Sequence, residues 1–553
     1  MKIVLVAINS KFVHSSLAVW CLAGVLEKYA PSTKYEIIEA TINEQTDEIT
    51  RRIITAKADI VGFSTYIWNK TLVLQISKSI KELTGAKILL GGPEVSYNTK
   101  EIMENNPFVD YVISGEGERP ISRLCNGEDL DDIEGLSFRA KDGICIKDPY
   151  VSKEDPPNPY VDDYFKRLNG RITYIETSRG CPYHCAFCLS GRCGGVRFFD
   201  LEASKEKILL LANSGTRTVK FVDRTFNADR KRAIEIFEFL IENYKVKIPE
   251  GVCFHFEIEG ELIDEHTVNV LSRAPKGFIQ FEIGIQSFNE KTLKCINRKT
   301  NLVKLKENIA KLLELKNIHI HIDLIAGLPY EDWNSIENSF NEAYKLNPHM
   351  LQLGFLKLLH GAEMREEINK YKTAFSDTPP YEITSNDWLN EHELEKLHLF
   401  EDVFEKLYNS GRFAYTIEYL NGLYQNHFEM YLKLSLYIGQ NCVIGTLDEF
   451  TKTVYQYFIQ DPSVDSKILR DVMAIDRLAT NRMGALPEFL KIKSEILKKC
   501  LNELEKNEET RRPRETKRAA TVLASEKKIV YVDYVEFDPI TKRYKTKFLD
   551  INE

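Results

Sequence analysis

The sequence lacks any long apolar run. No window of about 18 uninterrupted apolar residues occurs in the 553 residues, so a membrane-spanning helix is not expected. The first ten residues, MKIVLVAINS, contain a short apolar run without a small-residue cleavage site, and we expect a first β-strand there instead of a signal peptide. The chain also has no excess of basic residues. It contains 74 Lys and Arg and 82 Asp and Glu, which gives a net charge of −8. A nucleic-acid partner is therefore not expected.

Cysteines are few outside one cluster. The chain has 11, and only those near position 185 lie close together. Without an export signal, they are better explained as reduced thiols or metal ligands than as a disulfide framework, and we expect a cytoplasmic protein. The hydrophobic share of 43% and the charged share of 28% are typical of a globular protein. A length of 553 residues predicts roughly three to four domains.

Short apolar strands alternate with helices in residues 1–150. The expected strands are 1–9, 34–42, 58–68, 87–95 and 111–118. This pattern predicts a doubly wound, Rossmann-like domain with a parallel sheet covered on both faces. Ligands of such sheets bind beyond the carboxyl ends of the strands, where the loops 64–66, 91–94 and 115–118 follow. A hairpin at 136–148 and a Pro-rich linker at 155–160 end this part of the chain.

A second alternating series covers residues 165–385. Its six expected strands begin near residues 171, 218, 251, 278, 319 and 350. Six strands with intervening helices predict a partial (β/α)6 TIM barrel, with its chemistry at the carboxyl ends of the strands. From 386 to 553 an apolar stripe at helical spacing predicts a mostly helical accessory domain of unknown role, with a closing hairpin at 527–550.

The strongest motif is the cysteine cluster in ETSRGCPYHCAFCLSGRCGG. Cys181, Cys185 and Cys188 have the spacing C-x3-C-x2-C, and three thiolates on one loop can bind three irons of a [4Fe–4S] cube and leave the fourth iron open. Two alternatives remain. One is a structural zinc site completed by Cys193 or His184, and the other is a closed cluster with Cys193 as fourth ligand. The position of the loop, after the first strand of a barrel-like series, favours an active site.

Several ordered motifs resemble the cobalamin-binding (B12-binding) radical S-adenosylmethionine protein family. The cysteine run carries the aromatic Phe187 just before its last cysteine. FVDRTFN, FHFEIEGELID, FEIGIQSFNEKTL, HIDLIAGLPYE and LQLGFLKLLHGAEM follow in the order of that family's barrel strands. LLGGPEVS, DYVISGEGE and GLSFRAKDGICIKD resemble its cobalamin-binding half. The resemblance covers roughly residues 1–385.

The resemblance implies three cofactors: a [4Fe–4S] cluster on the three cysteines, S-adenosylmethionine on its open iron, and cobalamin. Reduction of the cluster would cleave S-adenosylmethionine to a 5′-deoxyadenosyl radical. The S-adenosylmethionine would be contacted by residues at the barrel strand ends, namely Phe187 near the adenine, Asp223 with Arg224, Glu257, Glu282, Gln286 and Ser287. The alternatives are a salt-bridged barrel carboxylate for Glu257, a strand-terminal cap for Gln286 and Ser287, and a simple Asp223–Arg224 pair.

Cobalamin would bind at the carboxyl-end loops of the first domain. The residues expected to contact it are Ser64, Thr65, Gly91, Gly92, Pro93, Glu94, Gly115, Glu116 and Gly117. Glycines there allow a close backbone approach, and Ser64 and Thr65 offer hydroxyls to the nucleotide tail. The alternative is a Rossmann-like domain without this ligand. The motif D-x-H-x-x-G, which supplies a lower cobalt ligand, is absent: around His14, Phe12 and Leu17 replace its Asp and Gly.

The resemblance thus implies an enzyme, and the reaction we expect is radical methyl transfer to an unactivated carbon of a small molecule. An external one-electron reductant such as flavodoxin or ferredoxin would supply electrons. Cobalamin-dependent cyclisation or rearrangement is an alternative, and a non-catalytic cobalamin or redox sensor is another. Methylthiolation of RNA needs a second cluster, for which only the widely spaced Cys21, Cys125 and Cys145 are present in the first domain. No residue is predicted as a catalytic acid, base or nucleophile.

Overall fold

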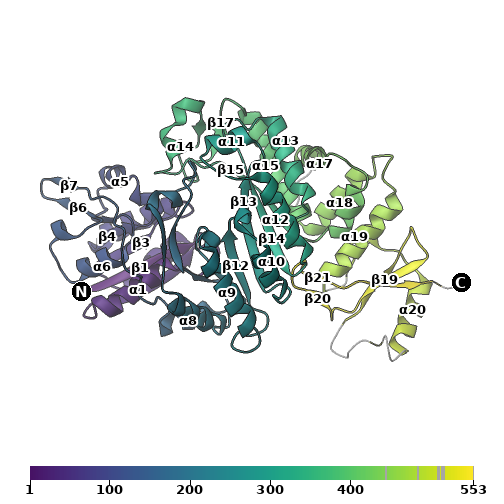
Figure 1. The fold of residues 1–553 in the computed structure, drawn as a ribbon, viewed down its shortest axis with the longest axis horizontal. Coiled ribbons are helices and arrows are strands. Elements are labelled where there is room, and N and C mark those ends of the chain that lie inside the picture. Colours follow the sequence, from purple (N-terminus) through teal and green to yellow (C-terminus); the bar gives the residue numbers. More distant parts are fainter. Residues whose placement is uncertain (442–444, 483–484, 507–510, 512–516, 552–553) are drawn as a thin grey trace. The chain divides into compact units, whose positions relative to one another are not determined.

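The computed structural model describes residues 1–441, 445–482, 485–506, 511 and 517–551, and the chain divides into two compact units. Unit 1 contains Met1–Arg273, Lys294–Lys299 and Phe355–Asp387, and unit 2 contains Ala274–Leu293, Thr300–Gly354 and Trp388–Glu553. Figure 1 labels the helices and strands along the chain. Within the described ranges, no helix is both long enough and apolar enough to cross a membrane.

Seven strands form the first sheet of unit 1, in the order β2-β1-β3-β4-β5-β6-β7. The strands β1 to β5 pair in parallel, and β6 and β7 continue the sheet as an antiparallel hairpin. The predicted parallel sheet and the hairpin after it are both confirmed. The strands are β1 (Lys2–Asn9), β2 (Lys34–Thr41), β3 (Ile60–Ser64), β4 (Lys87–Gly91), β5 (Tyr111–Ile113), β6 (Leu136–Ala140) and β7 (Gly143–Cys145).

Helices between these strands cover the sheet and bury its apolar residues. The helices are α1 (Ala18–Tyr29), α2 (Thr46–Thr55), α3 (Lys70–Thr84), α4 (Pro93–Ser96), α5 (Thr99–Asn105) and α6 (Glu118–Cys125). Helix α1 packs against α6, and α2 packs against α3. Seven of the eight residues of β1 are buried, as expected for a parallel strand covered on both faces.

The register of the strands brings the predicted ligand-binding loops to one edge. Ser64, the last residue of β3, lies beside Ala7 of β1 and Gly91 of β4, and Gly91 lies beside Ile113 of β5. Because these strands run in parallel, the loops that follow them all leave the same edge of the sheet. The predicted placement of these loops is therefore confirmed.

The second series alternates strands and helices, as in a β/α barrel. Its strands are β8 (Thr173–Ile175), β9 (Ser178–Cys181), β10 (Gly195–Phe198), β11 (Thr218–Phe221), β12 (Cys253–Ile258), β13 (Ile279–Gln286), β14 (Ile318–Ala326) and β15 (Met350–Phe355). Its helices are α7 (Asp162–Leu168), α8 (Leu201–Ala212), α9 (Arg230–Asn243), α10 (Glu265–Ser272), α11 (Glu290–Cys295), α12 (Leu302–Glu314), α13 (Trp333–Lys345) and α14 (Glu363–Glu366). The α/β class predicted from the sequence is confirmed.

Five helices of this series begin with the same side-chain cap. The side chain of the residue before each helix accepts a hydrogen bond from the third backbone N–H of that helix. The capping residues are Asp200 (α8), Asp229 (α9), Asp264 (α10), Asn301 (α12) and Asp332 (α13). Such caps satisfy one of the unpaired N–H groups at a helix start, so they determine locally where each helix begins.

Each unit holds part of the second series. In unit 1, β11 pairs in parallel with β8 and with β12. Four phenylalanine rings pack against one another between these strands and α9: Phe221, Phe226, Phe237 and Phe256. In unit 2, β13 pairs in parallel with β14, and β15 is the next strand. Buried and half-exposed residues alternate along β13, so this strand has one apolar face and one polar face.

The region after residue 386 is mostly helical, as predicted. Its helices are α15 (Glu391–Phe404), α16 (Ala414–Asn421), α17 (His427–Asn441), α18 (Leu447–Phe458), α19 (Ser466–Thr480) and α20 (Glu495–Lys506). Phe340 of α13 packs against Phe400 and Phe404 of α15 and Phe428 of α17, which fastens this region to the strands of unit 2. A small antiparallel sheet follows these helices, with β18 (Ala519–Val522), β19 (Lys528–Val532) and β22 (Lys547–Asp550). A short hairpin of β20 (Phe537–Asp538) and β21 (Arg543–Tyr544) precedes β22. Unit 1 contains one further antiparallel pair, β16 (Ala374–Phe375) with β17 (Ile383–Ser385).

Candidate functional site

A β-hairpin carries the predicted cluster cysteines. Strands β9 and β10 pair in antiparallel fashion, with Cys181 opposite Gly195 at the end of the pair. Cys185 and Cys188 lie in the loop that the two strands close. All three are free cysteines, Cys185 buried and the other two half-buried. The hairpin follows β8, so the loop lies at the carboxyl end of that strand.

Each of the three sulfurs has a hydrogen-bonding neighbour from the protein. The hydroxyl of Thr225 lies 3.3 Å from Cys181 Sγ, and the backbone N–H of Ser190 donates to Cys188 Sγ at 3.5 Å. The guanidinium of Arg298 donates to Cys185 Sγ at 3.9 Å. Hydrogen bonds and positive charge beside sulfur stabilise thiolates and tune an iron–sulfur cluster. The donor set therefore fits the cluster that the spacing predicts.

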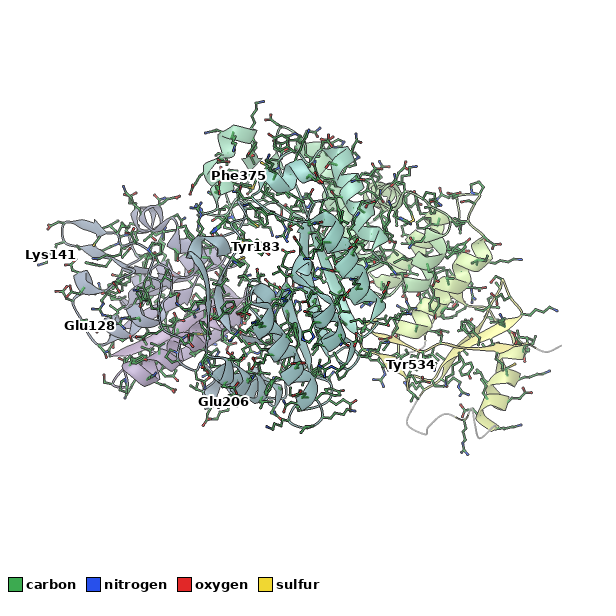
Figure 2. The ribbon with its side chains drawn as sticks, viewed as in Figure 1. Glu128, Lys141, Tyr183, Glu206, Phe375 and Tyr534 are labelled. Atoms are coloured by element: carbon green, nitrogen blue, oxygen red, sulfur yellow. The ribbon has the colours of Figure 1, made fainter. Side chains whose placement is uncertain are left out.

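Backbone hydrogen bonds fasten the cysteine loop on two sides. The N–H of Ala186 donates to the carbonyl of Ile296, and the N–H of Met364 donates to the carbonyl of Ala186, both at 3.0 Å. Burial raises the pKa of Tyr183 in this loop to about 12, and Figure 2 labels its side chain.

Of the residues considered as a fourth ligand, His184 is exposed, and the side chain of Cys193 lies outside the described part of the chain. Phe187 is half-buried, and its contact with adenine stays a prediction.

Asp223 anchors the strand that leads into the hairpin. Its buried carboxylate accepts hydrogen bonds from the backbone N–H of Thr177 at 3.0 Å and from the hydroxyls of Thr177 and Ser178 at 2.7 and 2.6 Å. Burial raises the pKa of Asp223 even though these donors oppose the shift. The structure thus gives Asp223 a role in holding the loop, while its predicted contact with a cofactor is untested.

A buried ion pair next to Cys185 was missed by the sequence analysis. Glu259 Oε2 lies 2.8 Å from Arg298 Nη2, and both side chains are at least nine-tenths buried. Glu257, the predicted residue two positions earlier, is half-buried and lies 3.8 Å from Lys220 and 3.7 Å from Arg224. The motif FHFEIEG contains both carboxylates, and only the arrangement in space shows that Glu259 is the one paired beside the cysteine loop.

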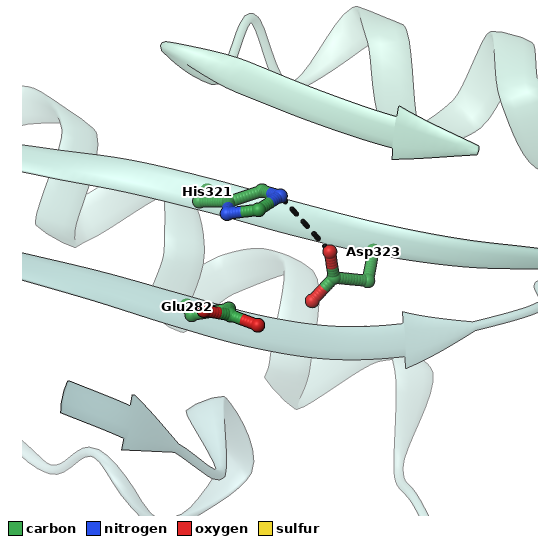
Figure 3. A group of neighbouring side chains, drawn as sticks. All are labelled: Glu282, His321 and Asp323. Carbon is green, nitrogen blue, oxygen red and sulfur yellow. Dashed lines mark ion pairs between the residues drawn. The ribbon is translucent and has the colours of Figure 1, made fainter. Parts of the chain in front are cut away.

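The polar face of β13 and β14 gathers a second group in unit 2. Glu282 lies directly opposite His321 in the register of the two strands, and Asp323 follows two residues after His321 on the same face. His321 Nε2 lies 2.9 Å from Asp323 Oδ1, and one ligand atom from each of the three residues falls within 4.8 Å of the others (Figure 3). This polar face can hold a polar ligand, which is consistent with the predicted site at Glu282.

Gln286 ends β13 in a strained conformation. Its φ of 74° is in the left-handed region, which is unusual for a residue with a side chain. A Cβ atom on Gly284 would lie 2.2 Å from Gln286 Nε2, so the glycine leaves room for this amide on the polar face. The neighbouring hydroxyl of Ser287 donates to the buried carboxylate of Glu331. The backbone N–H of Asn289 donates to the Ser287 hydroxyl oxygen at 2.8 Å. Ser287 therefore makes the contacts of a strand-terminal cap, and its contact with S-adenosylmethionine stays a prediction.

The edge of the first sheet is tightly packed around its glycines. Gly92 has a φ of 108°, and a Cβ atom there would lie 2.5 Å from the carbonyl oxygen of Thr65. Gly115 likewise approaches the backbone of Tyr150. Thr65 is fully buried, and its backbone N–H donates to the carbonyl of Gly91 at 2.7 Å. These glycines are thus required by close approach within the chain itself.

Gly91 is the least crowded of the glycines at this edge. A Cβ atom on Gly91 would meet only the carbonyl oxygen of Ile113, at 3.8 Å, and Gly91, Ser64, Pro93 and Gly117 are half-buried. A large macrocycle can approach such an edge of backbone and small side chains. The residues at this edge, small and partly exposed, are therefore compatible with a contact to cobalamin.

Two carboxylates predicted at the same edge are engaged by protein groups. Glu94 is 3% exposed, accepts a hydrogen bond from the hydroxyl of Tyr381 at 2.9 Å, and lies 3.7 Å from Lys70 Nζ. Glu116 forms ion pairs with Arg179 and Arg197. His14, considered as a cobalt ligand, lies 2.6 Å from the hydroxyl of Tyr174. The predicted cobalamin contacts of Glu94 and Glu116 remain untested.

Comparison with protein families identifies three regions of the chain. Residues 3–124 match the B12 binding domain, residues 175–343 match the radical SAM superfamily, and residues 369–550 match a protein family of unknown function, DUF4080. The first two regions contain the sheet edge and the cysteine loop described above. The resemblance inferred from the motifs is confirmed.

Two curated relatives share part of this chain. The 2-(S-pantetheinyl)-carbapenam-3-carboxylate methyltransferase of Streptantibioticus cattleyicolor is 23% identical over 439 residues, 71% of this chain and 61% of that protein. An anaerobic magnesium-protoporphyrin IX monomethyl ester cyclase of Rubrivivax gelatinosus is 24% identical over 351 residues, 60% of this chain and 62% of that protein. The chain thus spans less than two thirds of the length of either relative.

A solved structure shares the fold over most of the chain. The cobalamin-dependent S-adenosylmethionine radical enzyme OxsB, solved with aqua-cobalamin and S-adenosylmethionine, has a TM-score of 0.59 and 16% identity. The match covers 92% of this chain and 80% of OxsB. This likeness shows a common fold.

Proposed function

The chain joins a B12-binding domain to a radical SAM domain and so belongs to the B12-binding radical S-adenosylmethionine proteins, and we propose that it is an enzyme that transfers a methyl group to an unactivated carbon. Its cofactors would be a [4Fe–4S] cluster, S-adenosylmethionine and cobalamin. The likeness to a carbapenam methyltransferase supports methyl transfer. The substrate would be a small molecule, and a one-electron reductant of the flavodoxin or ferredoxin type would serve the cluster.

The cysteine loop is the observation that carries this proposal. Three free thiols lie close together on the hairpin and its loop, and each has a hydrogen-bonding protein group beside its sulfur. Cys181, Cys185 and Cys188 would hold the cluster, which when bound supplies the electron for reductive cleavage of S-adenosylmethionine. With only these three as ligands, one iron remains open for that cosubstrate.

The rest of the chain binds and orients in this proposal. Phe187 would pack against the adenine, and Glu257, Glu282 and Gln286 would contact the polar parts of S-adenosylmethionine. Asp223 holds Thr177 and Ser178, and through them the start of the hairpin. The edge residues of the first sheet, Gly91 among them, would receive cobalamin.

The experiment is S-adenosylmethionine cleavage by the anaerobically reconstituted chain. We expect 5′-deoxyadenosine to form under reducing conditions, and the triple variant Cys181→Ala, Cys185→Ala, Cys188→Ala to lose both the product and the bound iron. A matched control replaces three half-buried cysteines elsewhere, Cys145, Cys253 and Cys500, and should keep both. Retention of stoichiometric iron in the first variant would defeat the cluster assignment, and zinc in the wild-type chain would favour a structural site. Absence of 5′-deoxyadenosine from a chain with a full cluster would favour a sensor.

Cyclisation is a second candidate because of the likeness to the magnesium-protoporphyrin ester cyclase. The two reactions differ in the fate of the S-adenosylmethionine methyl group. With a methyl-deuterated cosubstrate, methyl transfer places the label in the product of the natural substrate, whereas cyclisation leaves the product unlabelled. Screening candidate substrates by mass spectrometry for the labelled methyl group therefore separates the two.

A further inference from the structure

The hairpin that carries the cysteine loop places two arginines side by side. In the register of β9 and β10, Arg179 lies directly opposite Arg197, two residues before Cys181. Like charges directly opposite each other destabilise an antiparallel pair. Both side chains are about four-fifths buried, so water screens this repulsion poorly. The base of the hairpin therefore needs a counter-charge.

Glu116 supplies that counter-charge from the first domain. Its Oε2 atom lies 2.5 Å from Arg179 Nη1 and 2.8 Å from Arg197 Nη2. Glu116 belongs to the loop after β5, at the sheet edge that we propose receives cobalamin. One carboxylate thus joins both strands of the cluster hairpin to that edge.

The other carboxylates near the hairpin contact one arginine each. Glu118 and Glu176 both pair with Arg179, at 2.5 and 2.8 Å. Burial opposes ionisation of Glu118, but Arg179, a backbone hydrogen bond and the charge of Arg197 together outweigh burial and lower the Glu118 pKa. Among the residues that the structure describes, Glu116 is the only carboxylate in an ion pair with both Arg179 and Arg197.

Aromatic and backbone contacts complete the base of the hairpin. The guanidinium groups of Arg179 and Arg197 lie 5.8 and 5.6 Å from the centre of the Phe199 ring. Arg197 also donates a hydrogen bond to the carbonyl of Ser152. These contacts hold the arginines in place but add no negative charge, so they cannot substitute for Glu116.

We propose that Glu116 is a positioning residue for the iron–sulfur loop, holding the hairpin closed through Arg179 and Arg197 and thereby connecting the cobalamin-binding edge to the cluster. This inference rests on the proposed function for the identity of the cluster. It assigns Glu116 to the cluster loop in place of the cobalamin contact expected from the sequence. The cobalamin-binding domain then contributes to cluster binding without providing a ligand.

The test compares four full-length variants with the wild-type chain: Glu116→Gln, Glu116→Gln with Arg197→Gln, Arg197→Gln alone, and the control Glu128→Gln. Glu128 pairs with Arg123 on the surface of the same domain, so the control removes a carboxylate charge without touching the hairpin. The measurements are the rate of iron release to a chelator, the EPR spectrum of the reduced cluster, and cobalamin affinity.

We expect Glu116→Gln to release iron about tenfold faster with an altered EPR spectrum, because loss of outer-shell partners weakens metal sites by about that factor or more. Cobalamin affinity should be unchanged. The double variant should lose iron more slowly than Glu116→Gln, because it removes the repulsion together with the counter-charge. Glu128→Gln should match the wild type.

Two results would overturn the inference: wild-type iron release and EPR in Glu116→Gln, or loss of cobalamin affinity with unchanged iron release. Hydrogen exchange of residues 178–198 in the cluster-free chains provides a readout that does not depend on the cofactors. Faster exchange in Glu116→Gln supports the role of Glu116 in holding the hairpin, and equal exchange contradicts it. If the wild-type chain takes up no [4Fe–4S] cluster, the proposed function fails, and this exchange comparison still decides whether Glu116 holds the hairpin.

Discussion

At the scale of single residues, Arg298 connects a buried carboxylate to Cys185. It pairs with Glu259 at 2.8 Å and donates to Cys185 Sγ, and burial of Glu259 raises the pKa of that carboxyl although Arg298 opposes the shift. Replacing Arg298 by Met leaves a buried carboxylate without its partner. We expect this variant to lose about 3–5 kcal/mol of unfolding free energy in urea titrations.

The double variant Arg298→Met with Glu259→Gln removes both charges and serves as the matched comparison. We expect it to recover most of the lost stability, because replacing a whole buried pair is far less costly than breaking it. Equal stability of the single and double variants would contradict the importance of this pair.

His360 should make the chain sensitive to acid. Burial, followed by the charges of Arg365 and Lys70, lowers the pKa of His360 from 6.5 to about 4. The unfolded chain therefore takes up a proton at a higher pH than the folded chain, and stability is lost as the pH falls from about 6.5 towards 4.

Between pH 7 and pH 4, His360 lowers the free energy of unfolding by at most about 3 kcal/mol. The measurement is urea unfolding at both pH values for the wild type and for His360→Gln, which cannot be protonated. We expect the pH-dependent loss to be smaller in the variant. An identical loss would show that His360 does not titrate in this way.

At the scale of elements, the hairpin of β9 and β10 depends on Gly180. Its φ is 93°, and a Cβ atom there would lie 1.9 Å from the carbonyl oxygen of Gly195. Alanine at this position would push the two strands apart. We expect Gly180→Ala to lose most of its bound iron after reconstitution, measured as iron and sulfide per chain.

Gly194 offers a control in the same loop. It also has a positive φ, of 73°, but a Cβ atom there would meet nothing within 4 Å. Gly194→Ala should therefore show only the conformational penalty of about 1–2 kcal/mol and keep its iron. If the two variants lost iron equally, strand separation would not be the cause.

At the scale of the whole molecule, cofactor binding should stabilise the native state. Hydroxocobalamin at about 100 times its dissociation constant should raise the unfolding free energy by about 2.7 kcal/mol. Thermal unfolding with and without the ligand measures this effect. Cobinamide, which lacks the nucleotide tail, should stabilise less if the sheet edge receives that tail, and no stabilisation by either compound would argue against cobalamin binding.

Much of this fold is visible in local sequence patterns. Three features depend on neighbours within a few residues: the apolar run of β1, the alternation of strands and helices, and the Asp and Asn caps. Hydrophobic periodicity indicates the strands and helices, and the type of residue before a helix indicates its cap. The cysteine spacing likewise lies within eight residues. Such features are encoded over short distances along the chain, so the α/β class, the order of the regions and a loop that carries three neighbouring cysteines could be predicted.

Long-range pairing was decided only by the tertiary structure. Glu116 lies 63 residues from Arg179, and Glu259 lies 39 residues from Arg298. Burial makes an unpaired charge costly, so the fold selects partners by proximity in space, which sequence separation does not reveal. The cofactor contacts that the motifs indicate for Glu257 and Glu116 stay predictions. The structure adds two pairings that the motifs do not reveal: Glu259 with Arg298 beside Cys185, and Glu116 with the two arginines of the cysteine hairpin.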